Sequence, residues 1–292
     1  MLLAPVAFAY AFLSPAPVHY RINAILDGFL PVFGGNEGKL EAKLMMQVTS
    51  EPSLTGTTVT TELKEATLLF DGSALPLGVE DVKRVFPKME WDVSSSGTVR
   101  SKTAAPQVPI RLPGLDPARF LEMTLVPVEF GSEPKESWTF SRDFSGSAMK
   151  SDCKWEPDGR VEIGTKQVLN FFEDESLTSV DKSKAIQEVR SELAGKGRAV
   201  FDIKRGLLRS YTMKSETLST VTDLQSGAKS KRILKSQMQV DLVESPPAPV
   251  EPPDWWTRAK QTGTLAREYW NRIGAPQLRA WIQKLVTSVV GG

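Results

Sequence analysis

The chain has 292 residues, 40% of them hydrophobic and 24% charged, so a substantial folded core is expected and global disorder is excluded. Its 36 basic residues are balanced by 35 acidic ones, which leaves no overall positive field to attract nucleic acid. One cysteine, Cys153, excludes an intramolecular disulfide, and a single histidine, His19, argues against Ser-His-Asp or Cys-His catalysis.

The N-terminal stretch has the features of an export signal. Residues 2–13 are almost wholly apolar, and Ala9-Tyr10-Ala11 has the A-x-A pattern of a cleavage site. The stretch is shorter than the roughly 20 apolar residues that span a bilayer. We therefore expect residues 1–17 to be a signal peptide and the protein to be exported, either periplasmic or in the cell envelope. The alternative is a buried first strand.

From residue 18 to 243 the dominant hydrophobic period is two, which indicates strands with one dry and one wet face. We predict that residues 18–245 form a mainly β domain, a large antiparallel meander sheet or open barrel with short helices. The parity of the apolar residues shifts between Leu63 and Leu68, which predicts a bulge or bend. The side chains expected on the dry face include Val18, Tyr20, Ile22, Ala24, Leu40, Leu44, Met46, Phe201, Met238 and Val240.

Few helices are expected in this domain. Residues 78–86 have the spacing of a short helix, and residues 115–123 begin with Asp116 and Pro117, a good helix start. Residues 183–195 fit a helix or a strand, and their position between two strand-like runs favours a strand. Lys204-Arg205-Gly206 is predicted to be the turn of a hairpin.

Two motifs within residues 80–243 carry a resemblance to a known group. Pro127 bounds a strand-like run that is followed by Trp138, and a later hairpin has the pattern G-x-G-x-x-x-F-D-x-x-x-G. The hairpin matches are Gly195, Gly197, Phe201, Asp202 and Gly206. The chain resembles a family of exported bacterial β-rich domains of unknown function. The resemblance implies an envelope-side antiparallel sheet and no catalytic residue. Many members carry a lipid anchor, for which this chain has no N-terminal cysteine.

A different kind of sequence follows the sheet. Residues 246–253 contain five prolines and predict an extended linker. Residues 254–292 have helical periodicity, interrupted at Gly274 and Pro276, and predict two amphipathic helices. Six basic against two acidic residues give this tail a charge of +4, which leaves −3 for the rest of a +1 chain. Four of the seven tryptophans lie here.

We expect this tail to dock on another surface, because so much aromatic area is not normally left in water. Three receptors remain open: the chain's own sheet, a partner chain or second copy, and a membrane interface. The predicted docking residues are Trp255, Trp256, Tyr269, Trp270, Ile273, Leu278, Trp281, Ile282 and Leu285.

The sequence contains little that indicates chemistry. His19 lies on the predicted polar face, and Cys153 is expected to be incidental at a loop edge. The acidic run 173–176 lacks the spacing and glycine of a calcium loop and is expected to be a solvated strand end. We predict no catalytic residue, metal site, cofactor or nucleic acid. The leading hypothesis is a non-enzymatic scaffold or accessory subunit of the bacterial envelope. The alternative is a carrier of a lipid or other apolar ligand on the concave face of the sheet.

Overall fold

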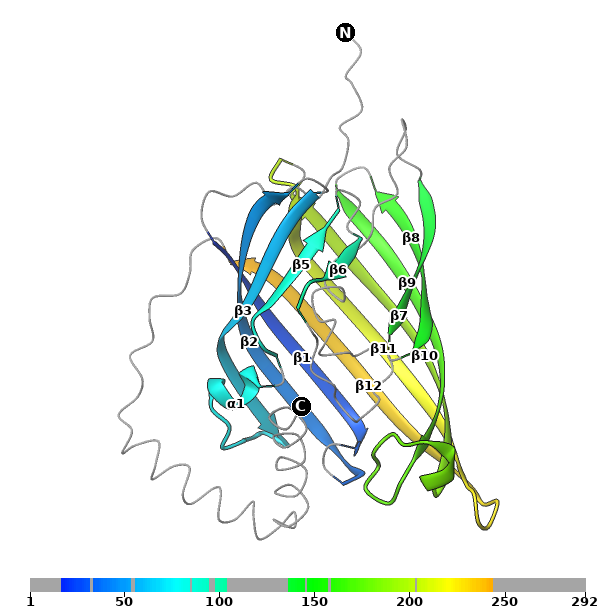
Figure 1. The fold of residues 1–292 in the computed structure, drawn as a ribbon. Coiled ribbons are helices and arrows are strands. Elements are labelled where there is room, and N and C mark those ends of the chain that lie inside the picture. Colours follow the sequence, from blue (N-terminus) through cyan, green and yellow to red (C-terminus); the bar gives the residue numbers. More distant parts are fainter. Residues whose placement is uncertain are drawn as a thin grey trace.

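The structure is a computed structural model that describes residues 17–31, 34–53, 56–84, 86–94, 98–103, 136–144, 146–156, 159–202 and 204–243. These residues form one antiparallel sheet of twelve strands (Figure 1). The predicted mainly β meander is therefore confirmed. The strands are β1 (Val18–Leu30), β2 (Asn36–Ser53), β3 (Gly56–Phe70), β4 (Ser73–Ala74), β5 (Met89–Val93), β6 (Val99–Ser101), β7 (Ser137–Phe144), β8 (Ser147–Glu156), β9 (Arg160–Glu173), β10 (Gln187–Asp202), β11 (Leu207–Asp223) and β12 (Lys229–Val243).

The strand order places the first and last strands side by side. It runs β6-β5-β3-β2-β1-β12-β11-β10-β9-β8-β7, with β4 paired to β3. Because β1 pairs with both β2 and β12, the two edges of the sheet, β6 and β7, come from the middle of the sequence. No pairing joins these edges within the part of the chain that the structure describes, so the sheet is open. It curls strongly around its apolar face (Figure 1).

Alternating side chains explain why these segments form strands. In β9, Val161, Ile163 and Leu169 are buried on the inner face, whereas Glu162, Lys166 and Val168, which have the opposite parity, are exposed. The predicted shift of parity in β3 is confirmed as a β-bulge. Met45 pairs with Glu65 and Met46 pairs with Leu63, so that Lys64 is the extra residue.

The inner face holds a continuous apolar core. The main cluster draws residues from all the longer strands and from Val82 of the short helix α1 (Val79–Lys83). A second, smaller cluster lies around Leu30 and Phe70. Leu44, Met46, Met238 and Val240 are buried in the main cluster, Phe201 packs against it, and Leu40 packs against the smaller one. These residues are core, as the sequence predicted.

The ambiguous local predictions have clear outcomes. The short helix expected within residues 78–86 is α1, and the segment 183–195 is mainly strand, because β10 starts at Gln187 after a 3-10 turn, η3 (Lys182–Lys184). The predicted turn at Lys204-Arg205-Gly206 joins β10 to β11. The signal peptide, the helix expected at 115–123 and everything after residue 243 lie outside the described residues. None of the helices in the described ranges is long and apolar enough to cross a membrane.

Candidate functional site

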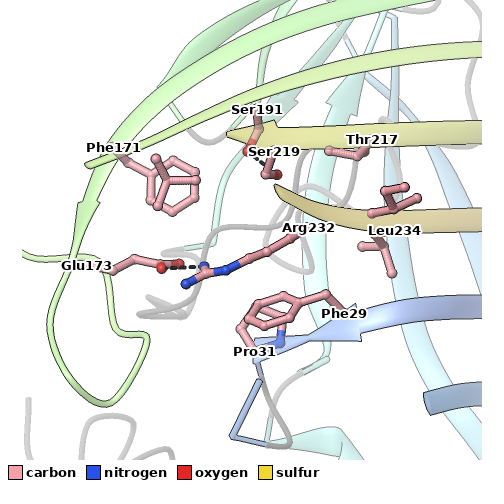
Figure 2. A pocket seen from close by; sticks show the side chains of 11 residues that line it. Phe29, Pro31, Phe171, Glu173, Ser191, Thr217, Ser219, Arg232 and Leu234 are labelled. Carbon is pink, nitrogen blue, oxygen red and sulfur yellow. Dashed lines mark hydrogen bonds and ion pairs between the residues drawn. The ribbon is translucent and has the colours of Figure 1, made fainter. Parts of the chain in front are cut away.

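The most unusual polar group on the inner face is a buried ion pair (Figure 2). Glu173 is the last residue of β9, and Arg232 lies in β12. Arg232 Nη1 is 2.6 Å from Glu173 Oε2, and Arg232 Nη2 donates a hydrogen bond to Gln187 Oε1, also at 2.6 Å. The guanidinium carbon lies 4.2 Å from the centroid of the Phe29 ring. The guanidinium is thus fixed by groups from β9, β10 and β1.

The two charges belong to strands that are not neighbours. β10 and β11 lie between β9 and β12 in the sheet. The intervening inner-face residues Ser191, Thr217 and Ser219 are small, and they leave room for the Arg232 side chain to reach Glu173 (Figure 2). Ser191 Oγ and Ser219 Oγ lie 2.7 Å apart and satisfy each other. The pair therefore ties four strands together at one end of the curled sheet.

Burial sets the electrostatics of the pair. The side chains of Arg232 and Glu173 are only 13% and 3% exposed. Burial raises the pKa of the Glu173 carboxyl above its ordinary value of 4.5, whereas the hydrogen bond and the charge of Arg232 oppose that rise. Since the ionised carboxylate has lost most of its hydration, it depends on Arg232 for compensation.

A small cavity lies beside the pair. Its volume is about 30 Å³, and its walls include Phe29, Phe171, Thr217 and Leu234. A cavity of this size holds about one or two water molecules and is too small for a lipid chain. Ser191 and Ser219 hydrogen-bond to each other, and apart from Thr217 and the ion pair the other lining residues are apolar, so the site has the chemistry of a structural polar cluster. No nucleophile with an adjacent base is present among its described residues.

The sequence prediction for this region was partly wrong. The acidic run 173–176 is not simply a solvated strand end, because Glu173 is buried and ion-paired. Asp174 does behave as a loop residue, since its Oδ1 accepts hydrogen bonds from the N–H groups of Ser176 and Thr178. Arg232 was not singled out at all. In both cases the alternation of side chains indicates the inner face, because Glu173 has the same parity as Leu169 and Arg232 has the same parity as Leu234.

The two residues considered for nucleophilic or acid-base chemistry lie apart. Cys153 was expected at a loop edge, but it lies within β8 and is buried in the main core. Burial raises the pKa of the Cys153 thiol to about 12, which leaves it protonated and unreactive at neutral pH. His19 is partly exposed on the outer face of β1, as predicted. The structure does not bring them together.

The outer face of the sheet is hollowed by a groove that crosses six strands. Its volume is about 650 Å³, and neighbouring strands contribute residues in register, from Ile25 of β1 through Gln237, Lys214 and Lys196 to Gly164 of β9 and Asp152 of β8. A second row along the groove contains Asp27, Lys235, Glu216, Ala194 and Lys166. We call these two rows the outer groove. Gly164 has no side chain and Ala194 has only a methyl group, so the outer groove is deeper at these two positions.

Three exposed apolar side chains lie beside the outer groove. Ile233 is 47% exposed, Leu218 is 38% exposed and Val168 is 44% exposed. Leu218 pairs with Ile233, and Glu192 pairs with both Leu218 and Val168, so the three form one row across β12, β11 and β9. We call them the exposed apolar row. A row of this kind on an otherwise charged face is a candidate contact surface.

The predicted docking residues Trp255, Trp256, Tyr269, Trp270, Ile273, Leu278, Trp281, Ile282 and Leu285 lie outside the described residues. Within the described ranges, no group of three or more His, Cys, Asp or Glu side chains could hold a metal ion.

Comparisons with known proteins give little guidance. No family model matches the chain, and no curated protein does so. Among solved structures, the chain has weak similarity to a mutant of the Rh. blastica porin, with 10% identity, a TM-score of 0.21, and coverage of 78% of this chain and 99% of the porin. It also matches the InvG secretin domain β-barrel of the Salmonella injectisome, with 9% identity, a TM-score of 0.14, and coverage of 85% and 68%. Similarity at this level assigns no function to the chain.

Proposed function

We propose that the protein is a non-enzymatic, exported scaffold or accessory subunit of the bacterial cell envelope. The curled sheet is a rigid platform, and the tail beyond the linker 246–253 docks to a partner chain. The tail is proposed to form two amphipathic helices, as its periodicity predicts. The predicted signal peptide, the resemblance to exported β-rich domains and the predicted docking residues all support this proposal.

The observation that carries the proposal is the contrast between the two faces of the sheet. On the inner face, the groups that could take part in chemistry have structural roles. Glu173 is ion-paired with Arg232, and Cys153 is buried in the main core. On the outer face, the outer groove and the exposed apolar row offer a surface on which a helix of the tail or of a partner can pack. A molecule with this distribution is better suited to binding another surface than to catalysis.

The alternative proposal, a carrier of an apolar ligand, has less support. The inner-face residues that would line a binding site, such as Leu44, Met46, Met238 and Val240, pack against one another as core. The inner-face cavity that described residues line beside Arg232 has a volume of about 30 Å³, below the roughly 300–1,000 Å³ of a typical ligand pocket.

Native mass spectrometry of the full chain purified from its own host tests the proposal. A stoichiometric protein partner is expected with the wild-type chain and should be lost in a Trp281→Asp, Leu285→Asp variant. Gln283→Glu, on the polar side of the same predicted helix, is the matched control and should keep the partner. A chain that carries a lipid and no protein would overturn the scaffold proposal in favour of the carrier.

A further inference from the structure

The outer groove has the dimensions of a site for a helix. It crosses six strands from β1 to β8, which at about 4.8 Å between neighbouring strands is about 24 Å. The first helix predicted in the tail, residues 254–273, would be about 30 Å long at 1.5 Å per residue. A helix of that length laid across the strands therefore fills the groove from end to end.

We propose that residues 254–273 of the same chain occupy the outer groove, with the apolar stripe of this helix against Ala194, Gly164 and the exposed apolar row. This inference rests on the proposed function and extends it, because it gives the two predicted helices of the tail different roles. The first helix anchors the tail to the sheet. The second helix, which contains Leu278, Trp281, Ile282 and Leu285, is left for the partner.

The length of the linker supports this occupant. β12 contributes Lys235 and Gln237 to the groove and ends at Val243. The groove therefore lies six to eight residues back along β12, or about 20–27 Å from the point where the tail leaves the sheet. The ten residues 244–253 reach about 31 Å in an extended polyproline conformation. The linker can bring residue 254 to the groove with little slack.

The lining of the groove suits a tryptophan-rich helix. Lys166, Lys196, Lys214 and Lys235 line it, and none of the four forms an ion pair within the described part of the chain. Lysine stems pack on apolar surface, and ammonium groups bind the faces of tryptophan rings. Trp256 and Trp270 lie on the same stripe of the predicted helix. The carboxylates of Asp27 and Glu216 in the groove are available to the arginines beside that stripe.

The exposed apolar row adds apolar surface that a docked helix would bury. Val168, Leu218 and Ile233 lie one row beyond the groove residues Lys166, Glu216 and Lys235 on the same strands. A helix is about 10 Å wide with its side chains, whereas successive outward rows are about 6.8 Å apart, so a helix centred on the second row of the groove reaches the side chains of this row at its edge. Docking would remove all three side chains from water.

Limited trypsin digestion of the full chain tests the assignment, since Arg258 and Arg267 lie in the proposed helix. Ala194→Arg fills the floor of the groove and Leu218→Lys charges the apolar row; both sites are exposed, so the sheet should fold normally. We expect the double variant to be cleaved after Arg258 and Arg267 about tenfold faster than the wild type. Thr67→Lys, at an exposed site on β3 away from the groove, is the matched control and should leave the rate unchanged.

Lysine cross-linking of the monomer provides the second measurement. We expect Lys260 to link to Lys166, Lys214 or Lys235 within one chain, and these links should be lost in the double variant. Equal cleavage rates in wild type and double variant, or links that form only between two chains, would overturn the assignment. Partner binding by the second helix is measured separately. If Trp281→Asp abolishes partner binding while Arg258 of the wild type is cleaved as fast as in the double variant, the proposed function stands and the assignment of the first helix to the groove is wrong.

Discussion

The Tyr20 hydroxyl donates a 2.8 Å hydrogen bond to the carbonyl oxygen of Leu208, and this bond joins β1 to β11 across the intervening strand β12. Both residues belong to the main core. Tyr20→Phe keeps the ring but leaves the buried carbonyl without this donor. We therefore expect the free energy of unfolding, measured by urea titration, to fall by about 1–2 kcal/mol.

An exposed hydrogen bond of the same length is the control for that measurement. Thr139 Oγ1 donates to Asp152 Oδ1 at 2.8 Å on the surface of the sheet. Because water replaces the lost partner there, Thr139→Val should change the free energy of unfolding by less than about 0.5 kcal/mol. Equal effects of the two substitutions would mean that the Tyr20 bond does not stabilise the curl of the sheet.

Removing only one partner of the Glu173–Arg232 pair should strongly destabilise the fold. Arg232→Met leaves the Glu173 carboxylate buried without its partner, and the expected loss is about 3–5 kcal/mol. The double variant Glu173→Leu, Arg232→Met removes both charges and should recover much of that loss. Urea titration of the two single variants and the double variant gives the coupling energy.

A surface pair shows what the same change costs when water is present. Arg198 and Glu162 lie 3.5 Å apart with side chains 47% and 51% exposed. Arg198→Met should therefore cost about 0–1 kcal/mol. If Arg232→Met costs no more than this, the inner pair is solvated in solution, and its assignment as a buried tie between strands is wrong.

Much of the fold, and part of the candidate site, could be predicted from the sequence. Alternation of side chains fixes which residues of a strand face inward, so the core positions of Met46, Met238 and Val240 and the bulge near Leu63 were predictable. The pairing of β1 with β12 was not, because a period of two carries no information about which strand is the neighbour. Alternation also places Glu173 and Arg232 on the inner face, but their contact depends on the order of the strands in the sheet, which the period does not give.

The pH dependence of stability should reveal the protonation state of Glu173. Since the folded pKa of Glu173 is raised above its ordinary value of 4.5, protonation favours the folded state. The stabilising effect of the acid form is fully present below pH 4.5 and is lost as the pH rises through the folded pKa. The free energy of unfolding of the wild type should therefore fall relative to Glu173→Gln as the pH rises above 4.5. Urea titrations at several pH values check the sign, and a rise would contradict it.

Gly28 should be the least replaceable glycine on the β1–β12 seam. Its φ of +125° is strained for any other residue, and an added Cβ would overlap the carbonyl oxygen of Ile233, which is backbone and cannot rotate away. Gly227 also has a positive φ, +71°, but an added Cβ there meets nothing within 4 Å. Gly227→Ala should therefore cost about 1–2 kcal/mol from the left-handed backbone alone. Gly28→Ala adds a steric overlap and should cost about 3 kcal/mol or more. Urea titration of both variants separates the two effects, because equal losses would show that β1 and β12 can move apart at this point without weakening the sheet.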